Sequence, residues 1–167
     1  MKKVITLAGG CFWGVERYYQ QLKGVLDTEV GYANGNFANP NYEDLKAHKA
    51  THVEAVKVLY DDAIISLVQI LEHLFRIINP FTVDHQGGDY GHQYRTGIYY
   101  LEDQDKNIID DFIANEQKKY SQKIRVEVER LHHFYNAEDY HQDYLEKNPF
   151  GYCHVNFALI KPEERKK

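Results

Sequence analysis

A short stretch near the N-terminus constrains the fold more than any other part of the chain: Gly9-Gly10-Cys11-Phe12-Trp13-Gly14. The apolar, β-branched run before it, residues 4–8, is short enough to be a buried strand. In residues 15–22, which follow it, apolar side chains recur at helical spacing. The chain must therefore turn from a strand into a helix at Cys11. The glycines allow backbone conformations that are closed to other residues.

This turn suits a nucleophilic thiol at Cys11. The free N–H groups and the positive dipole end of a helix favour an anion, so we expect a lowered pKa and a larger thiolate fraction. Phe12 and Trp13 add apolar surface beside the sulfur. The alternative for the same residues is a buried structural cysteine with two core aromatics. The glycines and the start of the helix favour the nucleophile.

Residues 52–60 form the clearest strand pattern in the chain. Strict alternation places Glu54 on the same face as Val56, Val58 and Tyr60. A carboxylate on an apolar face is desolvated, which raises its pKa and makes it a candidate general acid. A glutamate at a strand end that reaches solvent is the alternative.

Other segments predict helices and loops around this strand. Ser66 and Gln69 form a capping-box pattern that opens a helix, which Asn79-Pro80 ends. A second helix opens at Glu102-Asp103, and its buried stripe extends to Tyr120. Residues 33–41 and 81–93 are predicted to be loops because they are rich in turn residues.

Further strands are predicted at 25–32, at 94–101 with Tyr94 as its first residue, and at 125–130. Asp139 is a candidate cap for a short helix that ends near Asn148. This alternation of strands and helices predicts an α/β or α+β domain with helices packed on a mixed sheet.

Size and charge limit the remaining function classes. A chain of 167 residues is the size of one domain. The net charge of −5 argues against nucleic acid as the main partner, because binding a phosphate backbone requires a basic face. No apolar run reaches the length of a signal h-region or a membrane span. We expect a cytoplasmic protein without a membrane partner and a solvated tail at residues 161–167.

The chain has two cysteines, Cys11 and Cys153, near opposite ends of the sequence. A permanent disulfide is disfavoured in a reducing cytosol, and two thiols alone do not make the usual four-ligand zinc site. A transient, catalytic disulfide remains allowed.

The segment 10–14 resembles the signature of the A class of peptide methionine sulfoxide reductases. The resemblance extends to the stretches 52–56 around Glu54, 88–95 around Asp89 and 148–153 ahead of Cys153. The chain departs from the family pattern at Thr51 and His92, and it has no third cysteine further along. The resemblance implies one catalytic domain over 1–167. It also implies an α+β, ferredoxin-like two-layer sandwich with a mixed sheet, long loops and a coiled segment from about residue 131.

The resemblance also implies the catalytic roles. Cys11 attacks the sulfur of a methionine sulfoxide, Glu54 protonates the oxygen, and the hydroxyls of Tyr42 and Tyr94 hydrogen-bond it. A sulfenic acid on Cys11 then condenses with Cys153, the resolving cysteine, whose glycine- and proline-containing segment we expect to swing.

The implied substrate side includes Phe12 and Trp13 around the substrate's methyl group, together with Asp89 and Tyr152. The implied substrate is oxidised methionine of the S configuration, in proteins, in peptides or free. The implied electron donor is thioredoxin, with no bound cofactor and no metal.

Three other functions fit parts of the sequence. One is a cysteine hydrolase or acyltransferase, in which His52, His85 or His92 activates Cys11. Another is a binding module with an aromatic pocket for a thioether or peptide. The third is a metal site, although no HExxH or CxxC spacing occurs; its candidate ligands are His132, His133, Asp139, His141 and His154.

Overall fold

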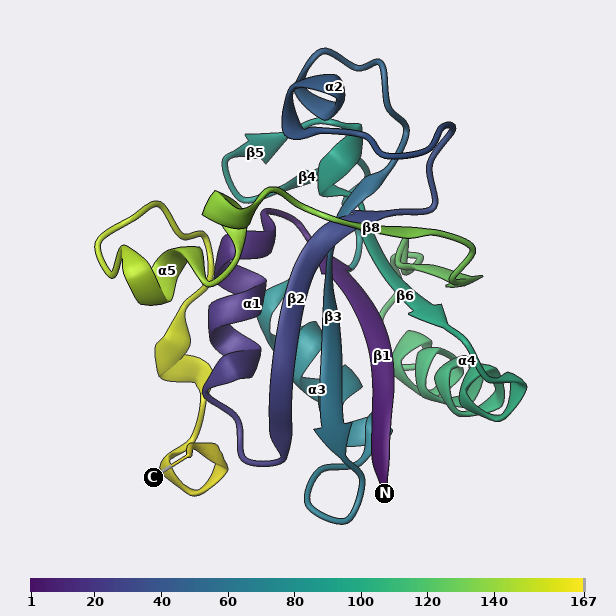
Figure 1. Cartoon of the computed structure of the whole chain (residues 1–167). Helices are drawn as coiled ribbons and strands as arrows, with labels where there is room; N and C mark the ends of the chain where they lie inside the picture. Colours follow the sequence, from purple (N-terminus) through teal and green to yellow (C-terminus); the bar gives the residue numbers. More distant parts are fainter. Residues whose placement is uncertain (167) are drawn as a thin grey trace.

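A curled, six-stranded mixed sheet forms the centre of the molecule (Figure 1). The structure is a computed structural model, and it describes residues 1–166. The strand order is β7-β6-β1-β3-β2-β8; β6 and β7 pair in parallel, and the other neighbours are antiparallel. The strands are β1 (Lys2–Gly9), β2 (Val25–Ala33), β3 (Val53–Asp61), β6 (Thr96–Tyr100), β7 (Glu127–Arg130) and β8 (Phe134–Asn136).

Helices and short turns complete the fold. The helices are α1 (Phe12–Gln20), α2 (Tyr42–Lys46), α3 (Leu67–Ile77), α4 (Asp103–Gln117) and α5 (Tyr144–Lys147). β4 (His85–Gln86) and β5 (Asp89–Tyr90) form a hairpin with a two-residue turn. The 3-10 turns are η1 (His92–Tyr94), η2 (Asp139–His141), η3 (Phe157–Leu159) and η4 (Pro162–Glu164). Within residues 1–166, no helix is long and apolar enough to cross a membrane.

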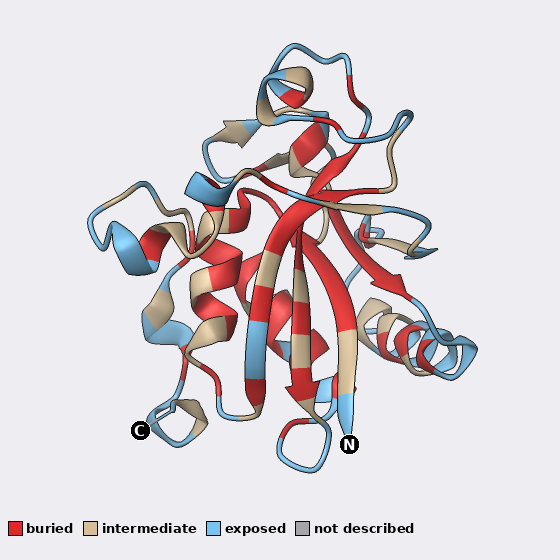
Figure 2. Ribbon diagram, in the orientation of Figure 1, coloured by how far each residue is buried: buried red, intermediate tan, exposed pale blue. Residues whose placement is uncertain are grey.

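The main core lies between the sheet and the helices α1 and α3. It combines apolar side chains of β1, β2 and β3 with the inward faces of these helices, and α4 packs beside α3 through Phe75 and Phe112. Figure 2 shows this buried layer in red along the strands and helices, with exposed residues in the loops. Removing this apolar area from water is the main contribution to stability.

The predicted capping box of α3 is confirmed. The Ser66 side chain accepts a hydrogen bond from the Gln69 backbone N–H at 3.1 Å, and the Gln69 side chain accepts one from the Ser66 N–H at 2.9 Å. These bonds satisfy two backbone donors that the first helical turn leaves without partners.

The register of the sheet brings two candidate site residues to the same end. Leu7 of β1 lies opposite Val56 of the antiparallel β3. The C-terminal end of β1, which leads into Cys11, therefore lies beside the N-terminal end of β3, which carries Glu54.

Three local predictions were wrong. Tyr94 lies in η1 rather than in a strand, because its backbone N–H bonds to Gly91 and closes a 3-10 turn. Tyr120 lies beyond the end of α4 and is 43% exposed. Asp139 caps no helix: Glu138 is the cap residue of η2, and α5 follows Asp143, which has a left-handed backbone.

The C-terminal segment 161–166 is largely exposed, as expected, but hydrogen bonds also dock it onto the rest of the fold; Lys167 lies outside the described residues. The Lys23 N–H donates to the Glu164 carbonyl and the Lys166 N–H to the Gln21 carbonyl, each at 2.9 Å. These bonds join the segment to the loop that leaves α1.

Candidate active site

Cys11 lies in the turn between β1 and α1, at the cap position of the helix. The preceding Gly10 has a φ of 89°, a conformation that favours glycine. A Cβ atom there would lie 2.7 Å from Gln86 and 3.1 Å from the ring of His154. Glycine therefore allows both the turn and the close packing of two later segments around it.

The prediction of a lowered pKa for Cys11 was wrong. Only 7% of Cys11 is exposed, and burial raises the pKa of its thiol well above the usual range. Negative charge on Glu54, once it ionises, and on Asp89 raises the pKa of Cys11 further, whereas the Trp13 backbone N–H lowers it. Loss of water around the sulfur outweighs the favourable helix end. The resting site therefore holds a thiol.

Glu54 is buried at 1% exposure, which excludes a strand-end carboxylate that reaches solvent. One carboxyl oxygen accepts the Phe12 N–H at 3.3 Å, and Oε2 is buried without a hydrogen-bond partner. Burial raises the pKa of Glu54 to about 8, while the Phe12 N–H and the Gln93 side chain oppose the shift. A protonated carboxyl group at neutral pH therefore lies beside the Cys11 thiol.

Tyr42 and Tyr94 come from different elements to the same place. Tyr42 begins α2 and Tyr94 ends η1. Burial raises the pKa of Tyr42 to about 12 and that of Tyr94 further, and the neighbouring Glu54 and Cys11 act in the same direction. Both hydroxyls therefore keep their protons and can donate hydrogen bonds.

An aromatic cluster surrounds the start of α1. Trp13 stacks on Tyr144 with ring centroids 3.9 Å apart, and its indole N–H donates to Nδ1 of His141 at 3.0 Å. The buried Phe12 ring lies 5.8 Å from that of Tyr32 and 5.2 Å from that of His141. From the sequence, His141 is a candidate metal ligand only, and neither Tyr144 nor Tyr32 is predicted to lie in the site.

Glu138 is a further residue that was not predicted from the sequence. Its carboxylate accepts hydrogen bonds from the Tyr32 hydroxyl at 2.8 Å, the Tyr42 backbone N–H at 3.2 Å and the Tyr140 hydroxyl at 3.3 Å. Burial alone would raise the pKa of Glu138, but these and other hydrogen bonds lower it overall. An ionised carboxylate therefore holds Tyr42 against the segment before α5.

Asp89 joins the hairpin to the segment that carries Cys153. The Tyr152 hydroxyl donates to the Asp89 carboxylate at 2.9 Å, and Nδ1 of His154 lies 3.9 Å from the same group. Nε2 of His154 lies 2.9 Å from the Gly9 carbonyl. These contacts hold the segment over the Cys11 turn, so that the Cys153 sulfur lies against α1 with both thiols free.

The alternative chemistries receive little support from the geometry. The groups that act most strongly on the pKa of Cys11 are Glu54, the Trp13 backbone, Asp89 and Cys153, and none is a histidine. His52 is instead buried between the rings of Phe37 and Tyr135. In the described part of the chain, no group of three or more His, Cys, Asp or Glu could hold a metal ion.

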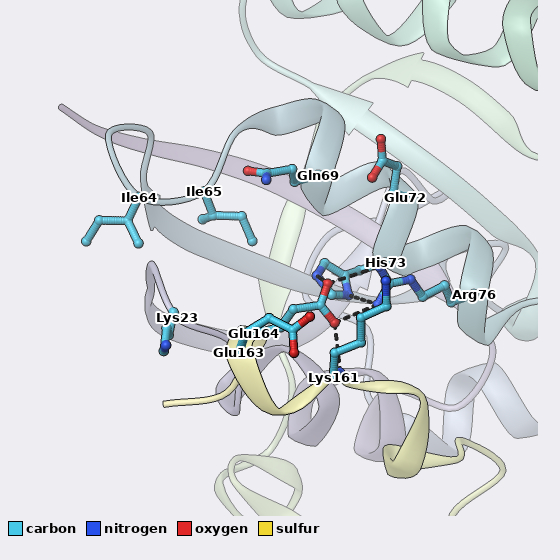
Figure 3. A pocket seen from close by; sticks show the side chains of 10 residues that line it. All are labelled: Lys23, Ile64, Ile65, Gln69, Glu72, His73, Arg76, Lys161, Glu163 and Glu164. Carbon is cyan, nitrogen blue, oxygen red and sulfur yellow. Dashed lines mark hydrogen bonds and ion pairs between the residues drawn. The ribbon is translucent and has the colours of Figure 1, made fainter. Parts of the chain in front are cut away.

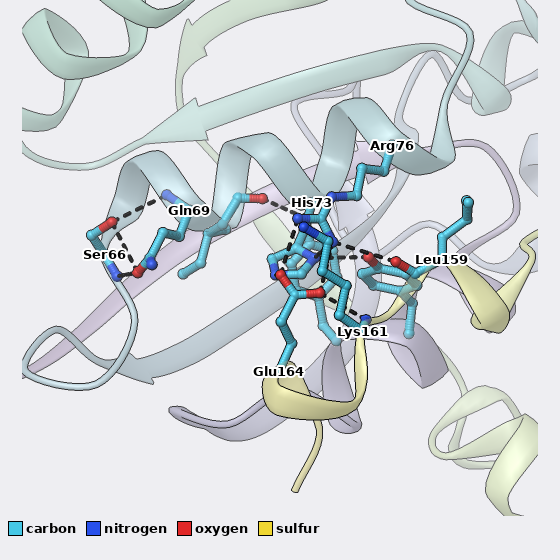
Figure 4. Close-up of polar contacts among 10 residues, drawn as sticks. Ser66, Gln69, His73, Arg76, Leu159, Lys161 and Glu164 are labelled. Carbon is cyan, nitrogen blue, oxygen red and sulfur yellow. Dashed lines mark hydrogen bonds and ion pairs between the residues drawn. The ribbon is translucent and has the colours of Figure 1, made fainter.

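A surface pocket of about 350 Å³ lies between α3 and the C-terminal segment and contains none of the candidate residues (Figure 3). Arg76 and Glu164 form a two-pronged ion pair beside it, with bonds of 2.8 and 3.0 Å, and His73 lies 3.6 Å from Glu164 (Figure 4). The Tyr18 hydroxyl is 2.7 Å from the other nitrogen of His73. This network fastens the C-terminal segment to α3.

Comparison with known proteins decides the family. The family model described as peptide methionine sulfoxide reductase matches residues 3–167. The chain belongs to the peptide methionine sulfoxide reductase family. The Ureaplasma urealyticum protein named peptide methionine sulfoxide reductase MsrA is 52% identical over 161 residues, which cover 96% of this chain and 98% of that protein.

Solved structures of the family have the same fold. The structure of reduced Mxr1 from Saccharomyces cerevisiae is similar with a TM-score of 0.87 and 36% identity, over 93% of this chain and 91% of that chain. The structure of Mxr1 in complex with Trx2 is similar with a TM-score of 0.61 and 30% identity, over 86% of this chain and 84% of that chain. The mixed α/β architecture is thus that of the reductase family.

Proposed function

We propose that the chain reduces methionine S-sulfoxide to methionine with Cys11 as the nucleophile and Glu54 as the proton donor. The observation that carries the proposal is the buried Glu54, whose unpartnered Oε2 and raised pKa provide a proton beside the Cys11 thiol. Such a proton is what a sulfoxide oxygen needs before its bond to sulfur can break.

The first step transfers the oxygen. The Cys11 sulfur loses its proton and attacks the sulfoxide sulfur, while Glu54 protonates the oxygen. Tyr42 and Tyr94, both protonated, donate hydrogen bonds to that oxygen as negative charge develops on it. The bond between the two sulfurs then breaks as the hydroxyl group passes from the substrate sulfur to Cys11, so that a thiol and a sulfoxide give a sulfenic acid on Cys11 and methionine.

The second step closes the cycle. The Cys153 sulfur attacks the sulfenic sulfur of Cys11, a disulfide forms, and the oxygen leaves as water. A thioredoxin then reduces this disulfide by thiol exchange and is itself oxidised. The complex of the related Mxr1 with thioredoxin Trx2 supports this donor.

The substrate-binding roles follow from the surroundings of Cys11. Trp13 and Phe12 offer apolar surface for the methyl group of the sulfoxide. Asp89 and Tyr152, joined by their hydrogen bond, form one side of the proposed substrate site. We propose that oxidised methionine binds against this side as a residue of proteins and peptides and as the free amino acid.

The proposal extends to the fold and the setting of the enzyme. We propose a ferredoxin-like core within one catalytic domain over 1–167. This core is supported by the chain order β1, α1, β2, β3, α3 and β6 and by the sheet order β6-β1-β3-β2. A cytoplasmic location is proposed on the two free thiols and their transient pairing.

An anaerobic single turnover tests the function. The reduced protein is mixed with each separated epimer of a blocked methionine sulfoxide, and intact mass and free thiols are then measured. We expect one epimer alone to yield one equivalent of thioether, with a loss of two hydrogens and of both thiols. Survival of both thiols with either epimer would refute the proposal and favour a binding module, in which Cys11→Ser leaves binding unchanged.

A further inference from the structure

Gly14 lies in the first turn of α1, three residues after Cys11, and is buried. Its backbone does not require glycine, because it is not among the residues with positive φ. A glycine within a helix costs about 1 kcal/mol relative to alanine. The reason for glycine at this position must therefore be the space that a side chain would occupy.

That space is filled by the segment that carries Cys153. A Cβ atom on Gly14 would lie 2.9 Å from the Cys153 Sγ and 3.0 Å from a methyl carbon of Val155. Neither neighbour can move away easily. The cysteine side chain has one torsion, and its sulfur is held at 3.3 Å by both the N–H and the carbonyl of Val155.

We infer that Gly14 is a positioning residue for the second step of the reaction, because its bare backbone lets the Cys153 sulfur lie directly on α1, one turn from Cys11. The inference rests on the proposed function of Cys153. In this position the sulfur lies beside the first turn of α1, the helix that Cys11 caps. Burial raises the pKa of the Cys153 thiol, and the Val155 N–H, which donates to the sulfur, opposes this rise.

The test measures methionine formation and disulfide formation separately in the Gly14→Ala variant. Reduced protein is mixed anaerobically with one equivalent of blocked methionine sulfoxide, quenched over time with a 1,3-dione that traps sulfenic acids, and analysed by intact mass. We expect methionine formation at the wild-type rate and disulfide formation slowed by about ten- to a hundredfold, since displacements near 1 Å have effects of this size. Sulfenic acid on Cys11 then accumulates. Disulfide formation at the wild-type rate would overturn the inference.

Two double variants serve as controls. Gly14→Ala in a Cys153→Ser background should release methionine as fast as Cys153→Ser alone; a slower release would mean that Gly14 acts on the first step and would overturn the inference. Melting temperatures give an answer independent of activity. Gly14→Ala should melt lower than wild type, and adding Cys153→Ala should restore part of the lost stability, because the colliding sulfur is gone while the close contact with Val155 remains. If Gly14→Ala combined with Cys153→Ala has the same low melting temperature as Gly14→Ala alone, the close contact between residue 14 and the Cys153 sulfur is contradicted.

A failure of the proposed function gives a different result. If Cys153→Ser still cycles with thioredoxin, Cys153 is not the resolving cysteine. If its cycling stops and Gly14→Ala resolves normally, only the role of Gly14 fails.

Discussion

At the scale of single residues, the site depends on groups whose pKa burial has raised. Cys11 and Glu54 both hold protons at rest because neither has enough water around it to stabilise a charge. The local sequence pattern correctly predicts that Cys11 lies at a helix end. It carries no information on the loss of water around the sulfur, which raises the pKa of the thiol. In the proposed reaction, the reactivity of this thiol therefore depends on the bound sulfoxide and on Glu54 rather than on a preformed thiolate.

Glu54→Gln should change how stability depends on pH. The folded-state pKa of Glu54, about 8, lies above its usual value, so its contribution is present at low pH and is lost as pH rises through 8. The amide group introduced by this substitution cannot ionise and still accepts the Phe12 N–H. Between pH 6 and 9 the free energy of unfolding of the variant should therefore rise by roughly 2 to 3 kcal/mol relative to wild type.

Urea unfolding under reducing conditions at the two pH values measures this difference. Glu29→Gln, which changes a 45% exposed carboxylate on β2, is the matched control and should show no such change. An equal pH dependence in wild type and Glu54→Gln would mean that Glu54 is ionised across the range.

At the scale of elements, the site is held together by segments that are distant in sequence. Glu138, before η2, accepts the N–H of Tyr42 at the start of α2 across 96 positions of the chain. The Trp13–His141 hydrogen bond spans 128 positions. Residues 138–141 therefore fix two of the residues proposed to bind the sulfoxide, Tyr42 and Trp13.

Glu138→Ala should slow the first turnover by about tenfold, because Tyr42 loses the acceptor that fixes its backbone. Rapid-quench measurement of methionine released from the reduced variant tests this. Tyr32→Phe removes another hydrogen bond to the same carboxylate without touching Tyr42, and it should keep the wild-type rate. A similar loss of rate in both variants would assign the effect to general packing.

These long separations along the chain also explain which features could be predicted from the sequence and which could not. The strand at β3, the capping box of α3 and the turn at Cys11 follow from residues within one element, and periodicity or local chemistry identifies them. Tyr94 and Asp139 lie in turns fixed by backbone hydrogen bonds, for which side-chain patterns give no signal. Glu138 and His141 act through long-range contacts, so only the density of ionisable and aromatic residues in 138–144 could have drawn attention to them.

At the scale of the whole molecule, the end of the chain closes the structure. Residues 161–166 form backbone hydrogen bonds with the loop after α1. The ion pair between Glu164 and Arg76 of α3 joins the same segment to α3. The stretch with Cys153 therefore runs between two fixed points, one at 138–143 and the other at the C-terminal segment. Its position over Cys11 is a property of the complete fold.

Glu164→Gln should lower the free energy of unfolding by about 2 kcal/mol at pH 7, the usual contribution of hydrogen bonds to a charged group. Glu164 is held by Arg76, whose hydrogen bonds lower the pKa of Glu164 to about 2. Urea unfolding gives the value, and Glu163→Gln is the control because that carboxylate is exposed in the same turn. Equal stability of the two variants would show that the ion pair contributes nothing measurable.

The stacking of Trp13 on Tyr144 has an optical consequence. Trp13 is the one tryptophan in a chain with 14 tyrosines, so excitation at the red edge of indole absorption observes this residue alone. Its ring lies two positions from Cys11, and its N–H bonds to His141. We therefore expect the fluorescence of the unlabelled protein to change when a sulfoxide binds beside Trp13 and when Cys11 is oxidised, so that a turnover can be followed in real time without a dye.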